Sequence, residues 1–150
     1  MSSSDPDTWF RFVRAHRCLI REIERRLAAA GLPAYAWYDA LWGLESGPEG
    51  TRRMSELADV MAIERYNLTR LVDRLEAEGL VTRSRASDDG RGAHAAITES
   101  GKVLRKKMWK IYEGAVDELF LSQFDDEQQR FFSEALERAA RAARNSGRAD

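Results

Sequence analysis

The sequence predicts a mainly α-helical protein with one small β-hairpin, and three observations lead to this fold class. The prolines, Pro6, Pro33 and Pro48, lie where a helix would begin or a loop would run, so long stretches lack helix-breaking residues. The 150-residue chain contains 21 alanines and 20 arginines, which are good helix formers. Helical apolar spacing dominates, and the pattern of a strand pair occurs once.

The first two predicted helices cover residues 7–30 and 33–46. Asp7 or Thr8 would cap the first helix, and Gly31 would end it. Its apolar residues are spaced three, four or seven apart and form one stripe: Trp9, Val13, Ile20, Ile23 and Leu27. The second helix is dense in aromatic residues and ends at a GPEG loop.

Two shorter helices and the hairpin follow in the middle of the chain. Residues 55–61 and 64–78 have helical spacing, are joined by a two-residue link and end at Gly79. Residues 80–85 and 93–98 read as strands that flank a polar, glycine-containing tip. Two short helices, a tight turn and a hairpin with a basic tip form the arrangement called a winged helix-turn-helix.

Two long helices complete the chain, with Thr98 and Asp125 as predicted N-caps. The apolar stripe of the fifth helix consists of Leu104, Met108, Ile111, Ala115 and Leu119. The stripe of the sixth consists of Phe132, Leu136, Ala139 and Ala143. Such stripes need a partner surface, which a second copy of the chain would supply.

Composition excludes several classes of protein. The chain has 24 Lys and Arg against 25 Asp and Glu, so its net charge of −1 excludes a polybasic nucleic-acid-binding protein. No apolar run approaches the ~18 residues of a membrane span. The N-terminus lacks signal-peptide features, so a cytoplasmic location is expected. The single cysteine, Cys18, excludes a disulfide framework and a cysteine-based zinc site.

The helix predicted at 64–78 has the two faces that a DNA-reading helix needs. Its apolar stripe consists of Leu68, Leu71, Val72 and Leu75. The residues left outward are Arg65, Tyr66, Asn67, Thr69, Arg70 and Arg74. They are rich in donors that can reach base edges or phosphates in a major groove. Acidic residues interrupt this group only at Glu64 and Asp73.

Short motifs stand along this part of the chain: SELAD at 55–59, LTRLVDRLE at 68–76, GLV at 79–81, DGRG at 89–92 and ITESG at 97–101. In type and order they resemble the MarR family of bacterial transcription regulators. The resemblance extends over the flanking helices and implies a homodimer that straddles a pseudo-palindromic operator in double-stranded DNA. It also implies a repressor that a small molecule releases.

The resemblance divides the chain into regions. Residues 51–98 would form the winged helix-turn-helix DNA-binding domain. Residues 7–46 and 99–146 would form the N- and C-terminal dimerisation helices, after a disordered N-terminus at 1–6. The chain departs from the family at Glu64, where serine is common, and at the bulky Tyr66. An individual operator sequence is therefore expected.

The DNA contacts implied by the resemblance fall on the predicted helix and hairpin. Asn67 would bond adenine, and Arg65 or Arg70 would read guanine or hold phosphate. Arg91, at the wing tip, would enter the minor groove, and Asp89 would orient an arginine. Contacts to the DNA backbone would come from Arg52, Arg53 and Ser55. The predicted set is completed by Tyr66, Thr69 and Arg74.

The resemblance further implies a small aromatic or phenolic effector near the first, second and fifth helices. The candidate ligand-binding residues are His16, Trp37, Tyr38, Trp42 and Tyr112. Core packing explains the rings equally well, because Tyr38 and Trp42 share a helical face. A carboxylate-bearing effector would need a cation, which His16 or Arg17 would supply.

Cys18 raises alternatives to this function. A redox-responsive regulator would use its thiol, whereas its place inside the first helix favours a buried structural thiol. A catalytic pair with His16 is excluded, because residues two apart on a helix point about 200° apart. No catalytic motif is present, so neither an enzyme nor a cofactor is expected. A helical protein-interaction module without DNA binding is the alternative of another class.

Overall fold

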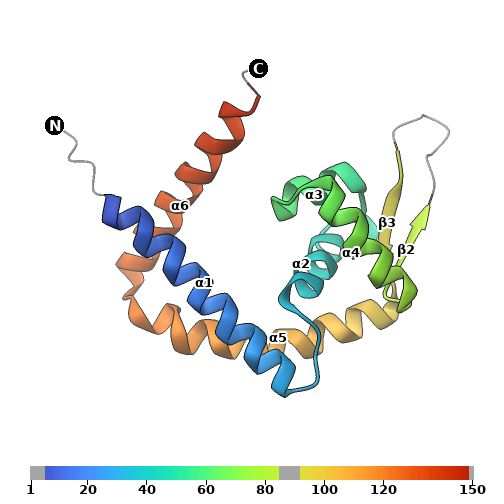
Figure 1. Ribbon diagram of the computed structural model, residues 1–150, viewed down its shortest axis with the longest axis horizontal. Helices are drawn as coiled ribbons and strands as arrows, with labels where there is room; N and C mark the ends of the chain where they lie inside the picture. The colour runs from blue at the N-terminus through green and yellow to red at the C-terminus, as the bar shows by residue number, and fades with distance from the viewer. Residues whose placement is uncertain (1–5, 85–91, 149–150) are drawn as a thin grey trace. The chain divides into compact units, whose positions relative to one another are not determined.

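The computed structural model describes residues 6–84 and 92–148, and the chain divides into two compact units, residues 1–113 and 114–150. The helices are α1 (Pro6–Ala29), α2 (Tyr35–Glu45), α3 (Met54–Met61), α4 (Arg65–Ala77), α5 (Glu99–Leu119) and α6 (Asp126–Ser146) (Figure 1). The strands are β1 (Thr51–Arg53), β2 (Val81–Ser84) and β3 (His94–Ile97), and short 3₁₀ turns lie at Pro48–Gly50 and Leu121–Gln123. This order confirms the predicted fold class.

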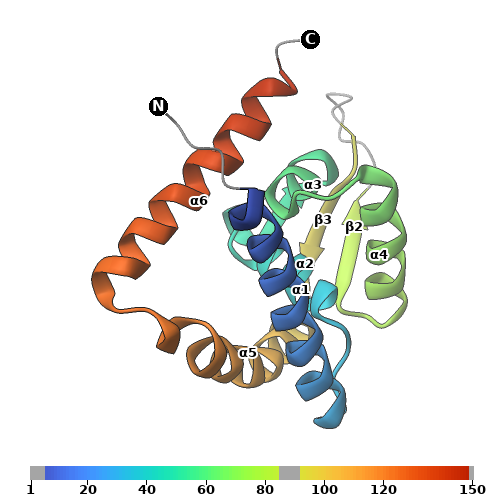
Figure 2. The same cartoon turned by 60° about the vertical axis from the view of Figure 1, so that its left-hand side comes forward.

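The small sheet of the first unit has three antiparallel strands in the order β1-β3-β2. Val81 pairs with Ile97 across β2 and β3, and Thr51 pairs with Ala96 across β1 and β3. β2 also lies next to α4 (Figure 2). The sequence predicts only the hairpin. β1 was missed because three residues are too few to show an alternating pattern, and pairing with β3 makes them a strand.

Left-handed residues close both helices of the helix-turn-helix. Ala62 has a φ of 55°, and the N–H of Ile63 donates to the carbonyl of Ala58 at 3.1 Å. Gly79 has a φ of 73° after α4, where glycine avoids the strain that a side chain would bring. These caps confirm the ends predicted for the two helices.

One hydrophobic core joins α2, α3, α4 and the sheet. Its fully buried side chains include Leu41, Leu44, Leu57, Leu68, Val72, Leu75 and Val81. The predicted apolar stripe of α4 is thus confirmed, except that Leu71 is only partly buried. Burial of one stripe fixes which side of α4 remains in solvent.

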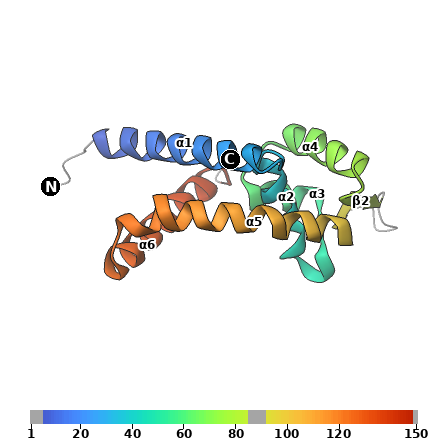
Figure 3. The same ribbon diagram turned by 90° about the horizontal axis from the view of Figure 1, so that it is seen from below.

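α5 follows β3 as one continuous helix (Figure 3). The Thr98 hydroxyl accepts the N–H of Gly101 at 3.1 Å and donates to the carbonyl of Gly79 at 2.8 Å. Thr98 is therefore the predicted N-cap, and it also ties the start of α5 to the end of α4. None of the helices in the described part of the chain combines the length and the apolar character of a membrane-spanning helix.

The second unit is organised around phenylalanines and a helix cap. Asp125 and Gln128 form a capping box at the start of α6, which confirms the second predicted N-cap. Phe120, Phe124 and Phe132 meet edge to face, with ring centroids 5.3–6.0 Å apart. α6, which is described throughout, buries none of its residues in the single chain.

Candidate nucleic-acid interface

The exposed side of α4 presents the six polar residues that the sequence predicts to face outward. Leu68, Val72 and Leu75 enter the core and leave the opposite side of the helix in solvent. The exposed residues of that side are Arg65, Tyr66, Asn67, Thr69, Arg70 and Arg74. A helix with charged and amide donors along one exposed side has the geometry that a DNA major groove accepts.

Tyr66 and Arg70 form a pair on this side. The Arg70 guanidinium donates from Nη1 to the Tyr66 hydroxyl at 2.9 Å and lies 5.6 Å from the centre of the ring. This contact restricts a long side chain before any partner binds. Thr69, in contrast, donates its hydroxyl to the Arg65 carbonyl at 2.9 Å, within the helix.

Arg83 joins β2 to α4, a contact that the sequence does not predict. Its Nη2 lies 2.5 Å from Asp73 and 3.1 Å from Glu76, and its backbone N–H donates to Glu76 at 3.0 Å. Hydrogen bonding with Arg83 lowers the pKa of the Glu76 carboxyl. The partners are ten and seven residues apart, a separation that neither helical nor strand periodicity signals.

The residues predicted to contact the DNA backbone lie in β1 and at the start of α3. Arg52 donates from Nε to the carbonyl of Gly43 at 2.5 Å and so caps the end of α2. Arg53 lies 4.0 Å from Glu56, and Ser55 is partly buried. These contacts give Arg52 a structural role, and its contact with DNA stays a prediction.

Two predicted wing residues, Asp89 and Arg91, lie outside the described residues. β2 ends at Ser84, which pairs with His94 at the start of β3. The predicted hairpin is therefore confirmed at its base, and the roles of the two wing residues stay predictions.

An aromatic cluster joins α2 to the part of α5 in the same unit. The rings of Tyr38 and Tyr112, both predicted ligand-binding residues, have centroids 5.0 Å apart. Tyr35 lies 5.3 Å from Tyr112, and Trp109 lies 5.8 Å from Tyr38. Burial raises the pKa of the Tyr35 and Tyr38 hydroxyls. Trp109 was missed, although it lies one helical turn before Tyr112.

The other three predicted ligand-binding residues occupy different surroundings. Trp37 packs against the core of the first unit, and His16 is exposed on α1. Trp42 is partly exposed beneath the Arg105 guanidinium, which lies 5.3 Å from its ring centre and also pairs with Glu45. The structure thus brings two of the five candidates into ring contact and places the other three in different surroundings.

Cys18 is exposed in the single chain, so the prediction of a buried thiol was wrong. The buried residues of α1 are Ile23 and Leu27. Cys18 precedes Ile23 by five positions, which at ~100° per residue turns its side chain about 140° from that stripe. A helix that buries one stripe leaves the rest of its circumference in solvent.

Asp39, beside the tyrosines in α2, gives a pH-dependent prediction. Burial raises the pKa of its carboxyl, so the folded state binds the proton more tightly than the unfolded state. Stability therefore falls as the pH rises above the ordinary value near 3.8. We expect Asp39→Asn to raise Tm at pH 7, with a gain that shrinks toward pH 4. A gain independent of pH would contradict this explanation.

Comparisons with known proteins point to one family. The model of the MarR family matches residues 31–92. Sco3205, a MarR family transcriptional regulator from Streptomyces coelicolor whose structure was solved in complex with DNA, superposes with a TM-score of 0.86 at 26% identity. That match covers 95% of this chain and 93% of the other. The chain resembles MarR-family regulators in sequence over residues 31–92 and in fold over nearly its whole length. Members of this family are transcription regulators, not enzymes.

Two further proteins are similar to this chain. CouR from Rhodococcus jostii RHA1, solved bound to p-coumaroyl-CoA, has a TM-score of 0.78 at 25% identity, over 89% of this chain and 92% of CouR. The uncharacterized HTH-type transcriptional regulator YfiV of Bacillus subtilis (strain 168) is 34% identical over 61 residues. That match covers 41% of this chain and spans only 38% of YfiV.

Proposed function

We propose that this protein represses transcription by binding an operator in double-stranded DNA as a homodimer, and that a small aromatic effector releases it. The exposed side of α4 supports DNA binding most directly, because Arg65, Asn67 and Arg70 project from a helix whose buried stripe is fixed in the core. The relative Sco3205, which was solved with DNA, supports it independently.

In this proposal the two copies of α4 enter successive major grooves about 10 base pairs apart. Asn67 bonds adenine through its side-chain amide, and Arg70 reads guanine with two donors. Arg65, at the first position of the helix, holds phosphate or guanine. Arg91 reaches the minor groove, an assignment that rests on the sequence alone.

Selection of bound DNA from a random pool by the full chain tests the proposal. We expect a pseudo-palindrome whose binding weakens steeply as the salt concentration rises. Because the net charge is only −1, DNA outside the selected sequence should bind weakly. Failure to enrich any sequence would refute DNA binding and favour a protein-interaction module.

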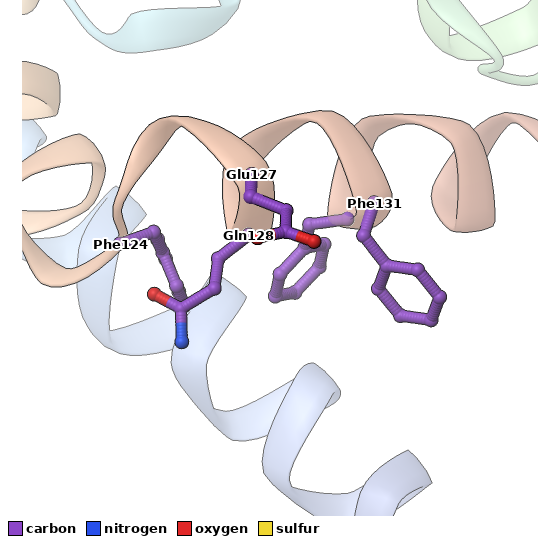
Figure 4. A pocket seen from close by; sticks show the side chains of 5 residues that line it. Phe124, Glu127, Gln128 and Phe131 are labelled. Carbon is purple, nitrogen blue, oxygen red and sulfur yellow. The ribbon is translucent and has the colours of Figure 1, made fainter.

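Exposed apolar side chains support the homodimer. On α1 and α6 these side chains are Trp9, Phe10, Phe12, Phe131 and Leu136. Phe131 also lines an apolar hollow of about 380 Å³. The other lining residues are Phe124, Glu127, Gln128 and Phe132. In Figure 4, the side chains of Phe124, Gln128 and Phe131 project on the same side of the segment 124–132. Large exposed apolar side chains on a helix are typical of surfaces that bind another protein.

Phe131→Glu is therefore expected to turn the dimer into a monomer. The side chain of Phe131 is 67% exposed in the single chain, so the fold should tolerate the change. A carboxylate in an apolar interface would have to lose its hydration without a partner. Light scattering after size-exclusion chromatography measures the mass. Ser133→Glu is the control, because it adds the same charge to α6 at a position about 200° around the helix axis from Phe131. A Phe131→Glu protein that stays dimeric would place the interface elsewhere.

The aromatic cluster of α2 and α5 is the place we propose for the effector. It contains Tyr38 and Tyr112, and the relative CouR was solved bound to p-coumaroyl-CoA. An effector releases DNA only if it binds one arrangement of the two α4 helices better than another. Titration of the operator complex with phenols and aromatic acids tests this, and release by none of them would count against the effector.

A further inference from the structure

Arg83 connects the hairpin to α4 through charged groups. It lies in β2, opposite Ala95 of β3, and contacts both Asp73 and Glu76 of α4. The backbone N–H of Arg83 also donates to Glu76, so the strand itself is attached to the helix. Within the described residues, these are the hydrogen bonds and ion pairs recorded between β2 and α4.

Apolar packing anchors only part of the hairpin. Val81 and Ala95 are buried in the core, whereas Thr82 and Ser84 are exposed. Beside α4, Arg83 borders a hollow of about 240 Å³ that is lined by Met54, Arg65, Leu68, Thr69, Arg83 and Ala93. Burial therefore decreases along β2 from Val81 to Ser84, and in this part of the strand the Arg83 contacts attach β2 to α4.

The same contacts account for two acids on a helix proposed to face DNA. Asp73 and Glu76 are exposed on α4, where free carboxylates would repel phosphate. Both are instead engaged by Nη2 of one guanidinium. Hydrogen bonding to Glu76 raises the pKa of the Arg83 guanidinium, which is charged at neutral pH in any case.

We propose that Arg83 is a positioning residue for DNA binding: by holding β2 to Asp73 and Glu76, it sets the angle of the hairpin against α4, so that one operator half-site is contacted by both at once. This inference rests on the proposed DNA binding and adds the means by which helix and wing are kept in register. Arg83 need not touch DNA to act in this way.

Two variants break the link from opposite sides. Arg83→Gln removes the guanidinium, and the double variant Asp73→Asn with Glu76→Gln removes its partners. If Arg83 positions the hairpin, both variants should lose the contact between the wing and DNA. If Arg83 instead bound phosphate directly, the double variant would free it and remove two negative charges, so DNA would bind more tightly. Glu78→Gln removes an exposed acid from the end of the same helix and is the charge control.

The test is footprinting on the operator selected by the unmodified full chain. We expect both variants to lose hydroxyl-radical protection of the outer minor-groove flanks while guanines in the major groove stay protected. Operator affinity should fall about tenfold. The negative slope of log K against log salt should become shallower by about 1 for each wing that loses its DNA contact. Tm should change by a few degrees at most, because exposed ion pairs add little stability.

The possible results separate the two proposals. Retained flank protection in either variant, or tighter binding by the double variant than by Glu78→Gln, would overturn the positioning role while DNA binding stands. If the unmodified chain selects no operator, the proposed function falls and this inference falls with it. Arg25→Gln, which removes a two-point pair with Glu22 on α1, should leave the footprint unchanged.

Discussion

Replacing Gly101 by alanine is expected to lower the free energy of unfolding by about 2 kcal/mol. A Cβ atom at this position would lie 2.3 Å from the carbonyl oxygen of Leu80 and 2.7 Å from Cγ1 of Ile97. The Ile97 side chain can move, but the Leu80 oxygen is backbone and accepts the N–H of Thr98 at 3.0 Å. Relief of the clash between the new Cβ atom and the Leu80 oxygen therefore requires a shift of the first turn of α5.

That shift would disturb the contacts that hold α5 to the end of α4. Thr98 caps the helix at Gly101 and donates to Gly79, so both hydrogen bonds would lengthen. Overpacking costs about 1–3 kcal/mol, and a weakened hydrogen bond costs up to about 1 kcal/mol. The better helix propensity of alanine offsets about 1 kcal/mol of this, which leaves the net loss near 2 kcal/mol.

Gly114→Ala is the matched control in the same helix. No atom lies within 4 Å of a Cβ built at Gly114, so alanine should stabilise the protein by about 0.5–1 kcal/mol. Urea denaturation at one fixed protein concentration measures both variants, because dimerisation makes the midpoint depend on concentration. Equal effects at the two positions would contradict the close approach at Gly101.

The sequence predicts those parts of the fold that near neighbours determine. Thr98 and Asp125 were recognised as N-caps because a cap acts on backbone groups within one turn. The buried stripe of α4 follows from the helical period alone. The outward position of Asn67 and Arg70 follows from that stripe, so the exposed face of the candidate interface was predictable.

Contacts between distant parts of the chain were not predictable, because one sequence holds no record of them. Arg83 looks like any polar strand residue until the fold places it beside Asp73. Tyr38 and Tyr112 were chosen separately, and only the structure shows their rings in contact with Trp109. Arg52 carries a charge that suits phosphate, but the fold directs its Nε to a backbone carbonyl.

Replacing Arg70 by alanine is expected to reduce operator affinity at least about 30-fold. A good bidentate contact from arginine to guanine is worth about 1–3 kcal/mol. The proposed homodimer presents Arg70 twice, so the two losses sum to ~2–6 kcal/mol, or about 30-fold to about 20,000-fold. The hydrogen bond from Arg70 Nη1 to the Tyr66 hydroxyl, 2.9 Å long, should strengthen the Arg70–guanine contact. A guanidinium that is already held in place loses less conformational entropy when it binds.

Tyr66→Phe and Arg74→Ala resolve what Arg70 does. The phenylalanine keeps a ring beside the guanidinium and removes only its acceptor, so affinity should fall by a few-fold, with the same operator selected. Arg74→Ala, if Arg74 holds phosphate, should weaken binding to all sequences alike, whereas Arg70→Ala should relax the preference at one base pair in each half-site.

Unfolding cannot explain such a loss, because Arg70 is exposed and its replacement should change the free energy of unfolding by no more than about 0.5 kcal/mol. Equilibrium binding at one salt concentration, followed by reselection from the random pool, measures affinity and base preference separately. An Arg70→Ala protein that selects the same operator with unchanged affinity would show that α4 does not read bases through this residue. The Tyr66–Arg70 pair would then be a contact on the surface of α4 without a part in reading bases.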